Sequence, residues 1–354
     1  MPSSPSTYSV GLNHVGSYQV SGRPWIKHLT LAGNAKTLVE LPKVTERILI
    51  SNDYLAGNDL DIAYCEPKRA IDFTSTAEYY DTSFSTLSEF SISLWIKTPS
   101  SNLDIASKRI IDFNPTISTG TGIRTGNGRD IRFTIDGITT PGSGVNLDVD
   151  TWYHLTLTVK SGECKLFVNG QKVLESTSTF VSANGLEIGD AGGAGFDGIY
   201  SDMALFGRIL TETEVYSLWN NGGLFLPKGY SNLVSFWEFE DGTAALGGTG
   251  YKDYYSTPDT TSVIYDRMSG NNLSINIGGT PSNIAFVDGR LIEEALISHK
   301  ITLSGQEKIT LTNKSKQVFL RNTGGTPLDL SIFASLTSIP ASRMYDLTGP
   351  GIDE

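Results

Sequence analysis

Residues 90–97 read FSISLWIK, and this octapeptide is the clearest indication of the fold. Its apolar side chains fall mainly on every second position, the pattern of a β-strand with one face against a core. DIRFTID (130–136) and WYHLTLTV (152–159) repeat the alternation. KLFV (165–168) runs into Asn169-Gly170, the strongest two-residue hairpin signal, because both turn residues adopt positive φ. The centre of the chain is therefore predicted to be all-β.

The order of these strands resembles that of the laminin-G-like, concanavalin A-like jelly rolls. The run begins with RAIDF (69–73), passes through the strands above and FDGIYSD (196–202), and ends in LTETEVYSLW (210–219). The resemblance implies a β-sandwich that binds ligands or serves as a structural module. Such domains catalyse reactions only where catalytic carboxylates have been added.

One helix is predicted, from about Thr211 to Asn220. Thr211 suits the N-cap, Glu214 follows three residues later as in a capping box, and Gly222-Gly223 ends the helix. LVSFWEF (233–239) then begins a shorter echo of the strand pattern. We interpret residues 223–291 either as closing strands of the jelly roll or as a partial second copy of it.

The two ends of the chain resemble each other. LTLAGN (29–34) matches ITLSGQ (301–306), RILISN (47–52) matches QVFLRN (317–322), and DLDI (59–62) matches DLSI (329–332). The offset is 272 residues in the first match (301 minus 29) and 270 in the other two (317 minus 47, 329 minus 59). Each copy holds about four short strands, too few to bury a face alone. We expect the copies to pack as a second small β-sandwich, with the jelly roll inserted between them.

This organisation gives four segments. They are 1–68, the N-terminal half of a β anchor domain; 69–222, the jelly roll; 223–291, the segment with two interpretations; and 292–354, the C-terminal half of the anchor domain.

Composition narrows the classes of function. The net charge of -11 over 354 residues gives no global basic field for nucleic acid. No apolar stretch is long enough to insert in a membrane, and the start MPSSP shows no signal peptide. Cys65 and Cys164 lie too far apart in sequence to suggest a disulfide framework or a zinc site.

No catalytic residues are predicted. Glu238 and Glu240 have the spacing of a same-face carboxylate pair, but Asp241-Gly242 follows at once, so Glu240 lies at a strand end. The four histidines suggest no Ser-His-Asp arrangement, and His154 is interpreted as a framework residue. The protein is therefore predicted not to be an enzyme.

Two binding sites are candidates. Asp190, Asp197 and Asp202 cluster in the segment that closes the sandwich and are candidate Ca²⁺ ligands, because calcium prefers six to eight oxygens from irregular loops. The alternative is that these aspartates only form turns and caps. Tyr254 and Tyr255 lie in a loop-like stretch and are candidates for glycan binding.

The chain ends carry a second resemblance. VGSYQVSGRPW (15–25) and IPASRMYDLTG (339–349) look like the ends of virion structural proteins of tailed phages of marine bacteria, especially cyanophages. This resemblance implies a virion protein, such as a capsid decoration protein or a head or tail appendage, made in the host cytoplasm. Major capsid or other virion proteins are the expected partners, and a homotrimer is the preferred assembly. The expected docking residues, in loop-like sequence, are Trp25, Ile26, Met344 and Tyr345.

The competing interpretation is a free protein with a concanavalin A-like fold that binds or cleaves carbohydrate.

Overall fold

The computed structural model of the protein describes most of the chain. The described residues are 23–54, 57–63, 69–73, 79–98, 108–113, 120–126, 129–189, 195–220, 227–239, 263–264, 266, 268–275, 284–290, 300–312, 315 and 317–340. The chain forms two compact units, one of residues 1–67, 253–256 and 292–354, the other of residues 68–252 and 257–291. We call the first unit the repeat sandwich and the second the jelly roll.

The repeat sandwich has eight described strands in two four-stranded sheets, of order β1-β24-β3-β22 and β2-β23-β4-β21. The strands are β1 (Arg23–Leu31), β2 (Lys36–Glu40), β3 (Lys43–Asn52), β4 (Leu60–Ala63), β21 (Lys300–Leu303), β22 (Lys308–Leu311), β23 (Gln317–Asn322) and β24 (Leu328–Pro340). The predicted second sandwich, built from both chain ends, is confirmed.

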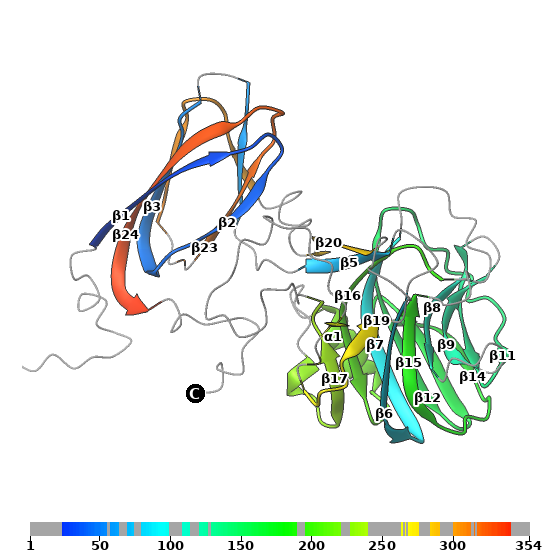
Figure 1. The fold of residues 1–354 in the computed structure, drawn as a ribbon. Helices are drawn as coiled ribbons and strands as arrows, with labels where there is room; N and C mark the ends of the chain where they lie inside the picture. The colour runs from blue at the N-terminus through cyan, green and yellow to red at the C-terminus, as the bar shows by residue number, and fades with distance from the viewer. Residues whose placement is uncertain are drawn as a thin grey trace, which may run out of the picture. The chain divides into compact units, whose positions relative to one another are not determined.

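The two halves of the repeat sandwich are interlocked. Along each sheet, strands from the N-terminal half alternate with strands from the C-terminal half, so every strand pair joins the two halves. Figure 1 shows this alternation where β24 lies between β1 and β3. Thr45 and Ser315, which are 270 residues apart, bond to each other, with the amide of Thr45 2.9 Å from the carbonyl oxygen of Ser315. Equivalent residues that meet in this way mark a pseudo-two-fold axis.

Two buried asparagines repeat the same symmetry. Asn52 Nδ2 donates to the carbonyl oxygen of Leu303 at 3.1 Å, and Asn322 Nδ2 donates to that of Leu31 at 3.2 Å. Because each pair maps onto the other by the sequence offset, the repeat seen in the sequence is a repeat of contacts as well.

Alternation of apolar side chains builds the core of the repeat sandwich. Its buried members are Leu31, Val39, Leu41, Ile48, Ile50, Leu60 and Ile62 from the first half and Leu303, Val318, Leu320, Leu328, Leu330, Ile332, Ala334 and Leu336 from the second. Neither half encloses this core without the other.

The sequence interpretation of Trp25 and Ile26 as loop residues is wrong, because both lie in strand β1. Pro24 beside them favours a loop, but β1 is an edge strand, where a proline does not disturb the ladder.

The jelly roll contains two large antiparallel sheets. Sheet I has the order β14-β13-β12-β7-β16-β5-β20, with β17 paired to β16, and sheet II has the order β11-β10-β9-β8-β15-β6-β19-β18. The strands are β5 (Arg69–Phe73), β6 (Tyr79–Leu87), β7 (Glu89–Lys97), β8 (Arg109–Phe113), β9 (Thr121–Thr125), β10 (Ile131–Ile135), β11 (Ile138–Thr139), β12 (Trp152–Lys160), β13 (Glu163–Val168), β14 (Gln171–Ser176), β15 (Ala183–Gly189), β16 (Ile199–Phe206), β17 (Leu233–Trp237), β18 (Val263–Ile264), β19 (Leu273–Ile275) and β20 (Ile284–Asp288).

The part of the chain between the helix and residue 291 adds strands to these sheets. In sheet I, β17 pairs with β16 and β20 pairs with β5. In sheet II, β19 pairs with β6 and β18 pairs with β19. The described strands of residues 223–291 therefore complete the two sheets of the jelly roll.

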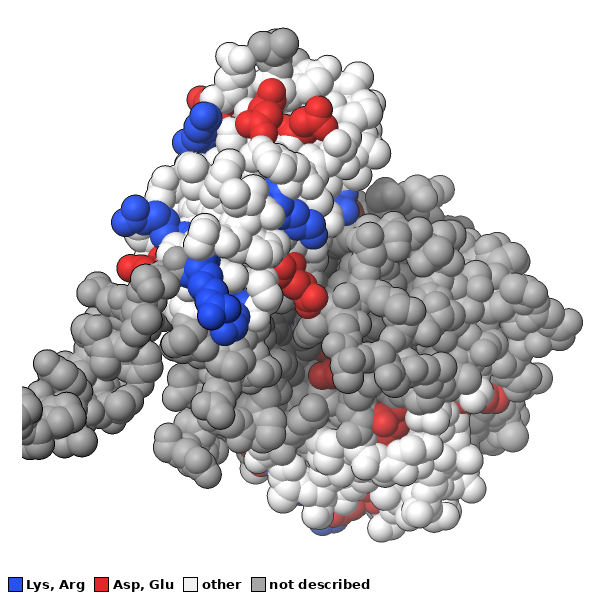
Figure 2. Space-filling view, turned by 60° about the vertical axis from the view of Figure 1, so that its left-hand side comes forward, with Lys and Arg blue, Asp and Glu red and all other residues white. Residues whose placement is uncertain are grey.

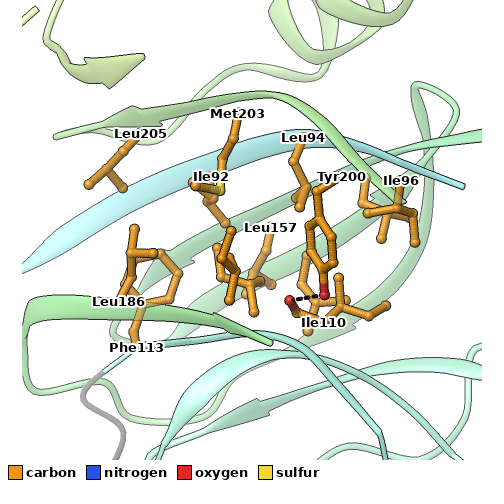
Figure 3. Packing of buried hydrophobic residues seen from close by; sticks show 14 of the residues in the cluster. Ile92, Leu94, Ile96, Ile110, Phe113, Leu157, Leu186, Tyr200, Met203 and Leu205 are labelled. Atoms are coloured by element: carbon orange, nitrogen blue, oxygen red, sulfur yellow. Dashed lines mark hydrogen bonds between the residues drawn. The ribbon is translucent and has the colours of Figure 1, made fainter. Parts of the chain in front are cut away.

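The core of the jelly roll lies between its sheets. In Figure 3, Ile92, Leu94 and Leu157 of sheet I face Phe113 and Leu186 of sheet II. Tyr200 is fully buried among them and donates its hydroxyl to the carbonyl oxygen of Ile110 at 2.8 Å (Figure 3). This bond satisfies a phenol that would otherwise be costly to bury.

Strand β7 is buried on both faces, although its sequence predicts a half-buried strand. Ser93, on the face away from the core, contacts His154 Nε2 at 2.8 Å. Burial, with the nearby charge of Arg290, lowers the pKa of His154 to about 3, so this framework histidine stays neutral. A second apolar cluster covers this face of sheet I, made of Trp95, Phe167, Ala204, Phe206, Leu210, Val215, Leu218 and Phe236.

Helix α1 (Glu212–Asn220) supplies two members of that cluster, Val215 and Leu218. The predicted capping box is confirmed, because the amide of Glu214 donates to Thr211 Oγ1 at 3.2 Å and the amide of Thr211 donates to Glu214 Oε2 at 2.8 Å. Arg208 also pairs with Glu214, and this hydrogen bond is the main reason that the pKa of Glu214 falls to about 2.

The strands that flank the insertion pair with each other in both units. In the repeat sandwich, β4 lies beside β21, with Ala63 opposite Lys300. In the jelly roll, β5 lies beside β20, with Arg69 opposite Asp288. In each unit, the strand that precedes or follows one linker thus lies beside the strand at the other linker. Ends that lie close together are the condition under which one domain tolerates insertion into another.

Candidate ligand-binding face

Three carboxylates form a row across the outer face of sheet II. Glu187 on β15 lies opposite Asp81 on β6 and opposite Asp112 on β8. Cross-strand neighbours of this kind have Cβ atoms about 4.5–5.5 Å apart. Leu186 and Ile188 on either side of Glu187 pack in the core, so Glu187 points to the outer face. We call these three residues the carboxylate row.

Three arginines form a second row on the same face. Arg124 on β9 lies opposite Arg109 on β8 and opposite Arg132 on β10. Their core-facing neighbours include Ile123 and Phe133. We call these three residues the arginine row. Asp112 and Glu187 are buried, with 4% and 5% exposure, whereas Asp81 and the three arginines are partly exposed. Side chains on rigid strands hold their positions more closely than side chains on loops, so the partly exposed members present a fixed pattern of donors and an acceptor.

The outer members of the arginine row have acidic partners. Arg109 Nε lies 3.6 Å from Asp112 Oδ2, and Arg132 Nη2 donates to Asp130 Oδ2 at 3.0 Å. The side chain of Arg124 makes neither a hydrogen bond nor an ion pair with any described residue. Burial lowers the pKa of Arg124, Asp112 opposes this effect, and Arg109 and Arg132 lower the pKa further.

Two glycines let the charged side chains lie close to the backbone. A Cβ atom on Gly120 would lie 2.0 Å from Asp112 Oδ1, and one on Gly126 would lie 1.8 Å from Arg132 Nη2. Any larger residue at these positions would displace the carboxylate or the guanidinium.

Two of the three predicted calcium ligands, Asp197 and Asp202, are described by the structure, and they do not form a metal site there. Asp197 precedes β16 and Asp202 lies within it, five residues further along an extended chain. Asp190 lies outside the described residues. Over the described ranges, no three His, Cys, Asp or Glu side chains are grouped to hold a metal ion.

The two described aspartates have different surroundings. Burial raises the pKa of Asp197, and Asp197 in turn contributes to the raised pKa of Asp72 after the larger effect of burial. Asp202 is buried in a register shift of β16 and has a φ of 43°. Both are therefore integrated into the sandwich rather than exposed at its rim.

The other predicted site residues are placed only in part. Tyr254, Tyr255, Met344, Tyr345, Glu240 and Cys65 lie outside the described residues. Trp25 packs against the core of the repeat sandwich, whereas Ile26 is 55% exposed. Glu238 follows directly after β17.

The spacing of charged residues along single strands does not reveal either row. Asp81, Asp112 and Glu187 come from strands far apart in sequence, and their alignment depends on register. The available signal was a charged residue at an outward position of each alternating strand, such as Arg132 in DIRFTID.

Residues 73–216 match the sequence model of a family described as the concanavalin A-like lectin/glucanases superfamily. The match lies within the jelly roll, whose two-sheet topology is consistent with a concanavalin A-like sandwich. No curated protein sequence matches the chain. Among the described residues, no helix is long and apolar enough to cross a membrane.

Several solved structures match parts of the chain. A candidate carbohydrate-binding protein from Bacteroides ovatus is 14% identical, with a TM-score of 0.47 over 77% of this chain and 94% of that one. A heptameric SAP-like pentraxin from Limulus polyphemus is 13% identical, with a TM-score of 0.38 over 45% and 84%. Domain 4 of a GH43 extracellular arabinanase from Geobacillus stearothermophilus, in complex with arabinotriose, is 15% identical, with a TM-score of 0.30 over 38% and 68%.

Proposed function

We propose that the jelly roll binds carbohydrate without cleaving it, and that the repeat sandwich attaches it to a larger assembly. The observation that carries the first part is the presence of the carboxylate row and the arginine row on one sheet face. Sugars offer hydroxyl groups that both donate and accept hydrogen bonds. Carboxylates accept and guanidinium groups donate, so the partly exposed Asp81 and the three arginines together complement such a ligand, with Asp112 and Glu187 buried beneath them.

Cleavage is the second candidate, favoured by the adjacent carboxylates. A retaining glycosidase uses two carboxyl groups about 5–5.5 Å apart, one as acid and one as nucleophile. Glu187 lies opposite Asp81 on β6 and opposite Asp112 on β8, so its neighbours are carboxylates on both sides. We favour binding because Asp112 lies beside Arg109, an arrangement that holds a carboxylate in place rather than one that releases a proton.

The variant Glu187→Gln separates the two functions. We expect the unchanged protein to be retarded by at least one polysaccharide in affinity electrophoresis and to release no reducing ends from it. Loss of a charged acceptor should weaken binding about tenfold. Glu175→Gln, on β14 of the opposite sheet, is the matched control and should bind normally. Release of reducing ends that stops in Glu187→Gln would establish the glycosidase instead.

The second part of the proposal concerns attachment to a virion of a tailed phage, on the capsid or the tail. It is supported by the resemblance of the chain ends to virion proteins. It is also supported by Ile26 and Phe333, which lie opposite each other on β1 and β24 and are 55% and 39% exposed. Figure 2 shows broad uncharged areas between scattered charges on the described surface of this unit. Exposed apolar side chains of this kind suit a protein contact.

Substitution of the exposed apolar pair tests the attachment. We expect the full chain to co-sediment with undecorated phage capsids as a homotrimer, and the double variant Ile26→Asp with Phe333→Asp to lose both properties. Ile138→Asp changes an exposed isoleucine of the jelly roll and should leave both intact. Equal co-sedimentation of all three proteins would remove this surface from the proposal.

A further inference from the structure

The arginine row is costly for the free protein. Like charges directly opposite each other on neighbouring strands are destabilising, and Arg124 has an arginine on each side. Natural sheets usually alternate charges of opposite sign across such positions. A row of three guanidinium groups on one face therefore calls for a compensating anion.

The carboxylates of the protein, Asp112 and Asp130, lie beside the two outer arginines of the row. Asp112 lies within ion-pair distance of Arg109, and Asp130 accepts from Arg132 while also accepting from the amide of Gly144 at 3.0 Å. Asp112 attracts Arg124 as well, but not within the 4.0 Å of an ion pair. Arg124 is thus the central donor of the row and the one whose hydrogen-bonding capacity is unused among the described residues.

The environment of Arg124 also favours an anionic partner. The guanidinium is half-buried, and burial together with the two neighbouring arginines disfavours its charged form. An anion placed against Arg124 would relieve both effects, because it supplies an opposite charge and accepts the hydrogen bonds that water supplies less well at a half-buried site.

We propose that Arg124, flanked by Arg109 and Arg132, recognises an anionic group of an acidic glycan, either a carboxylate or a sulfate. This inference rests on the proposed carbohydrate binding and names the class of glycan. The planar guanidinium fork matches the paired oxygens of both groups, and Asp81, the partly exposed member of the carboxylate row, receives a hydroxyl group of the same sugar chain.

The negative net charge of the protein limits long-range attraction of an acidic glycan. A protein with a net charge of -11 does not draw a polyanion by its long-range field. Binding therefore depends on the local geometry of the arginine row, and a nucleic acid, whose binding depends on many phosphate contacts, is disfavoured.

Two pairs of matched probes test the inference on the full chain. Polygalacturonate is compared with its methyl ester, and dextran sulfate with dextran, by titration calorimetry. We expect one acidic member to bind at least tenfold more tightly than its neutral partner. Arg124→Gln should weaken binding of that acidic probe about 10- to 100-fold and leave binding of the neutral partner within a factor of two. Arg124→Lys should retain part of the preference, because it keeps the charge but loses the fork.

Lys160→Gln is the control for loss of one positive charge. Lys160 is exposed at the end of β12 in the opposite sheet, and its removal should leave the preference unchanged. Thermal unfolding without ligand gives a second readout. Removal of a like-charge contact should raise the melting temperature of Arg124→Gln by up to about 4 °C. A merely structural arginine would lower the melting temperature, and that result would overturn the inference.

The remaining outcomes are also decisive. Equal affinity of the acidic and neutral probes for the unchanged protein would refute anion recognition while leaving carbohydrate binding in place. Tighter binding of single-stranded DNA than of either acidic glycan would also overturn the inference. Absence of binding to every polysaccharide, in this panel and in electrophoresis, would overturn the proposed function itself.

Discussion

Asp61→Ala is expected to lower the melting temperature of the repeat sandwich by about 12–24 °C and to leave the jelly roll intact. The carboxylate of Asp61 is fully buried and accepts from Lys300 Nζ at 2.9 Å, Thr302 Oγ1 at 2.7 Å and Arg321 Nε at 3.1 Å. Removing one partner of a buried ion pair costs about 3–5 kcal/mol. We expect about 3 kcal/mol, because Lys300 and Arg321 retain 32% and 28% exposure and are partly solvated when unpaired. For a unit of this size, each kcal/mol lost from the free energy of unfolding lowers the melting temperature by about 4–8 °C.

The same cluster gives the repeat sandwich a defined acid sensitivity. Burial alone would raise the pKa of Asp61, but hydrogen bonds from Thr302, Arg321 and Lys300 outweigh it and hold the pKa below its usual value. A depressed pKa in the folded state means that the stabilisation is present above pH 4 and is lost as the pH falls through the folded pKa. Asp61→Ala should therefore flatten the dependence of stability on pH below 4.

Scanning calorimetry with amide hydrogen exchange measures both effects, because exchange assigns each transition to its unit. Asp329→Asn is the matched control, since Asp329 is exposed and its side chain accepts, among the described residues, only from Thr30 Oγ1. This control should change stability by less than about 0.5 kcal/mol. An equal effect of the two variants would show that the buried cluster contributes little.

A chain that ends at residue 291 is expected to keep a folded jelly roll and to lose all structure in residues 23–63. Every strand pair of the repeat sandwich joins its two halves, so the N-terminal half retains no partner for any of its strands. Unpaired strands exchange amide protons at nearly the rate of an unfolded chain. The strands of the jelly roll lie between residues 69 and 288 and should keep their protection.

Addition of a peptide of residues 292–354 should restore protection to residues 23–63, because it supplies the missing strands. A peptide of the same composition in scrambled order serves as the control. Protection of residues 23–63 in the truncated chain alone would mean that the N-terminal half folds without its partner, against the observed strand order.

The sequence predicted the parts of the fold that depend on local patterns or on a constant offset. Alternation in FSISLWIK predicted β7, and Thr211 with Glu214 predicted the start of α1. The offset of 270 predicted that the chain ends pack together. It did not predict that their strands alternate within each sheet, because strand order depends on contacts between distant residues that leave no local pattern.

The candidate site shows the same division. An outward position for Arg132 follows from alternation along β10, but its place beside Arg124 depends on the register of two strands. The burial of Ser93 on the outer face of β7 depends on the second apolar cluster, which a sequence read strand by strand does not reveal.

The interlocked strand order has a consequence during synthesis on the ribosome. Strand β4 ends at Ala63 and its neighbour β21 begins at Lys300, so 236 residues are translated between them. At about 5–20 residues per second this interval lasts roughly 12–47 s. Throughout it, the first four strands of the nascent chain expose unpaired edges while the jelly roll completes its fold. Pro24 and Lys27 in β1 and Glu46 and Arg47 in β3 place a proline and charges on these edges. Such residues discourage pairing with other chains, so they protect the waiting half from aggregation until its partner leaves the ribosome.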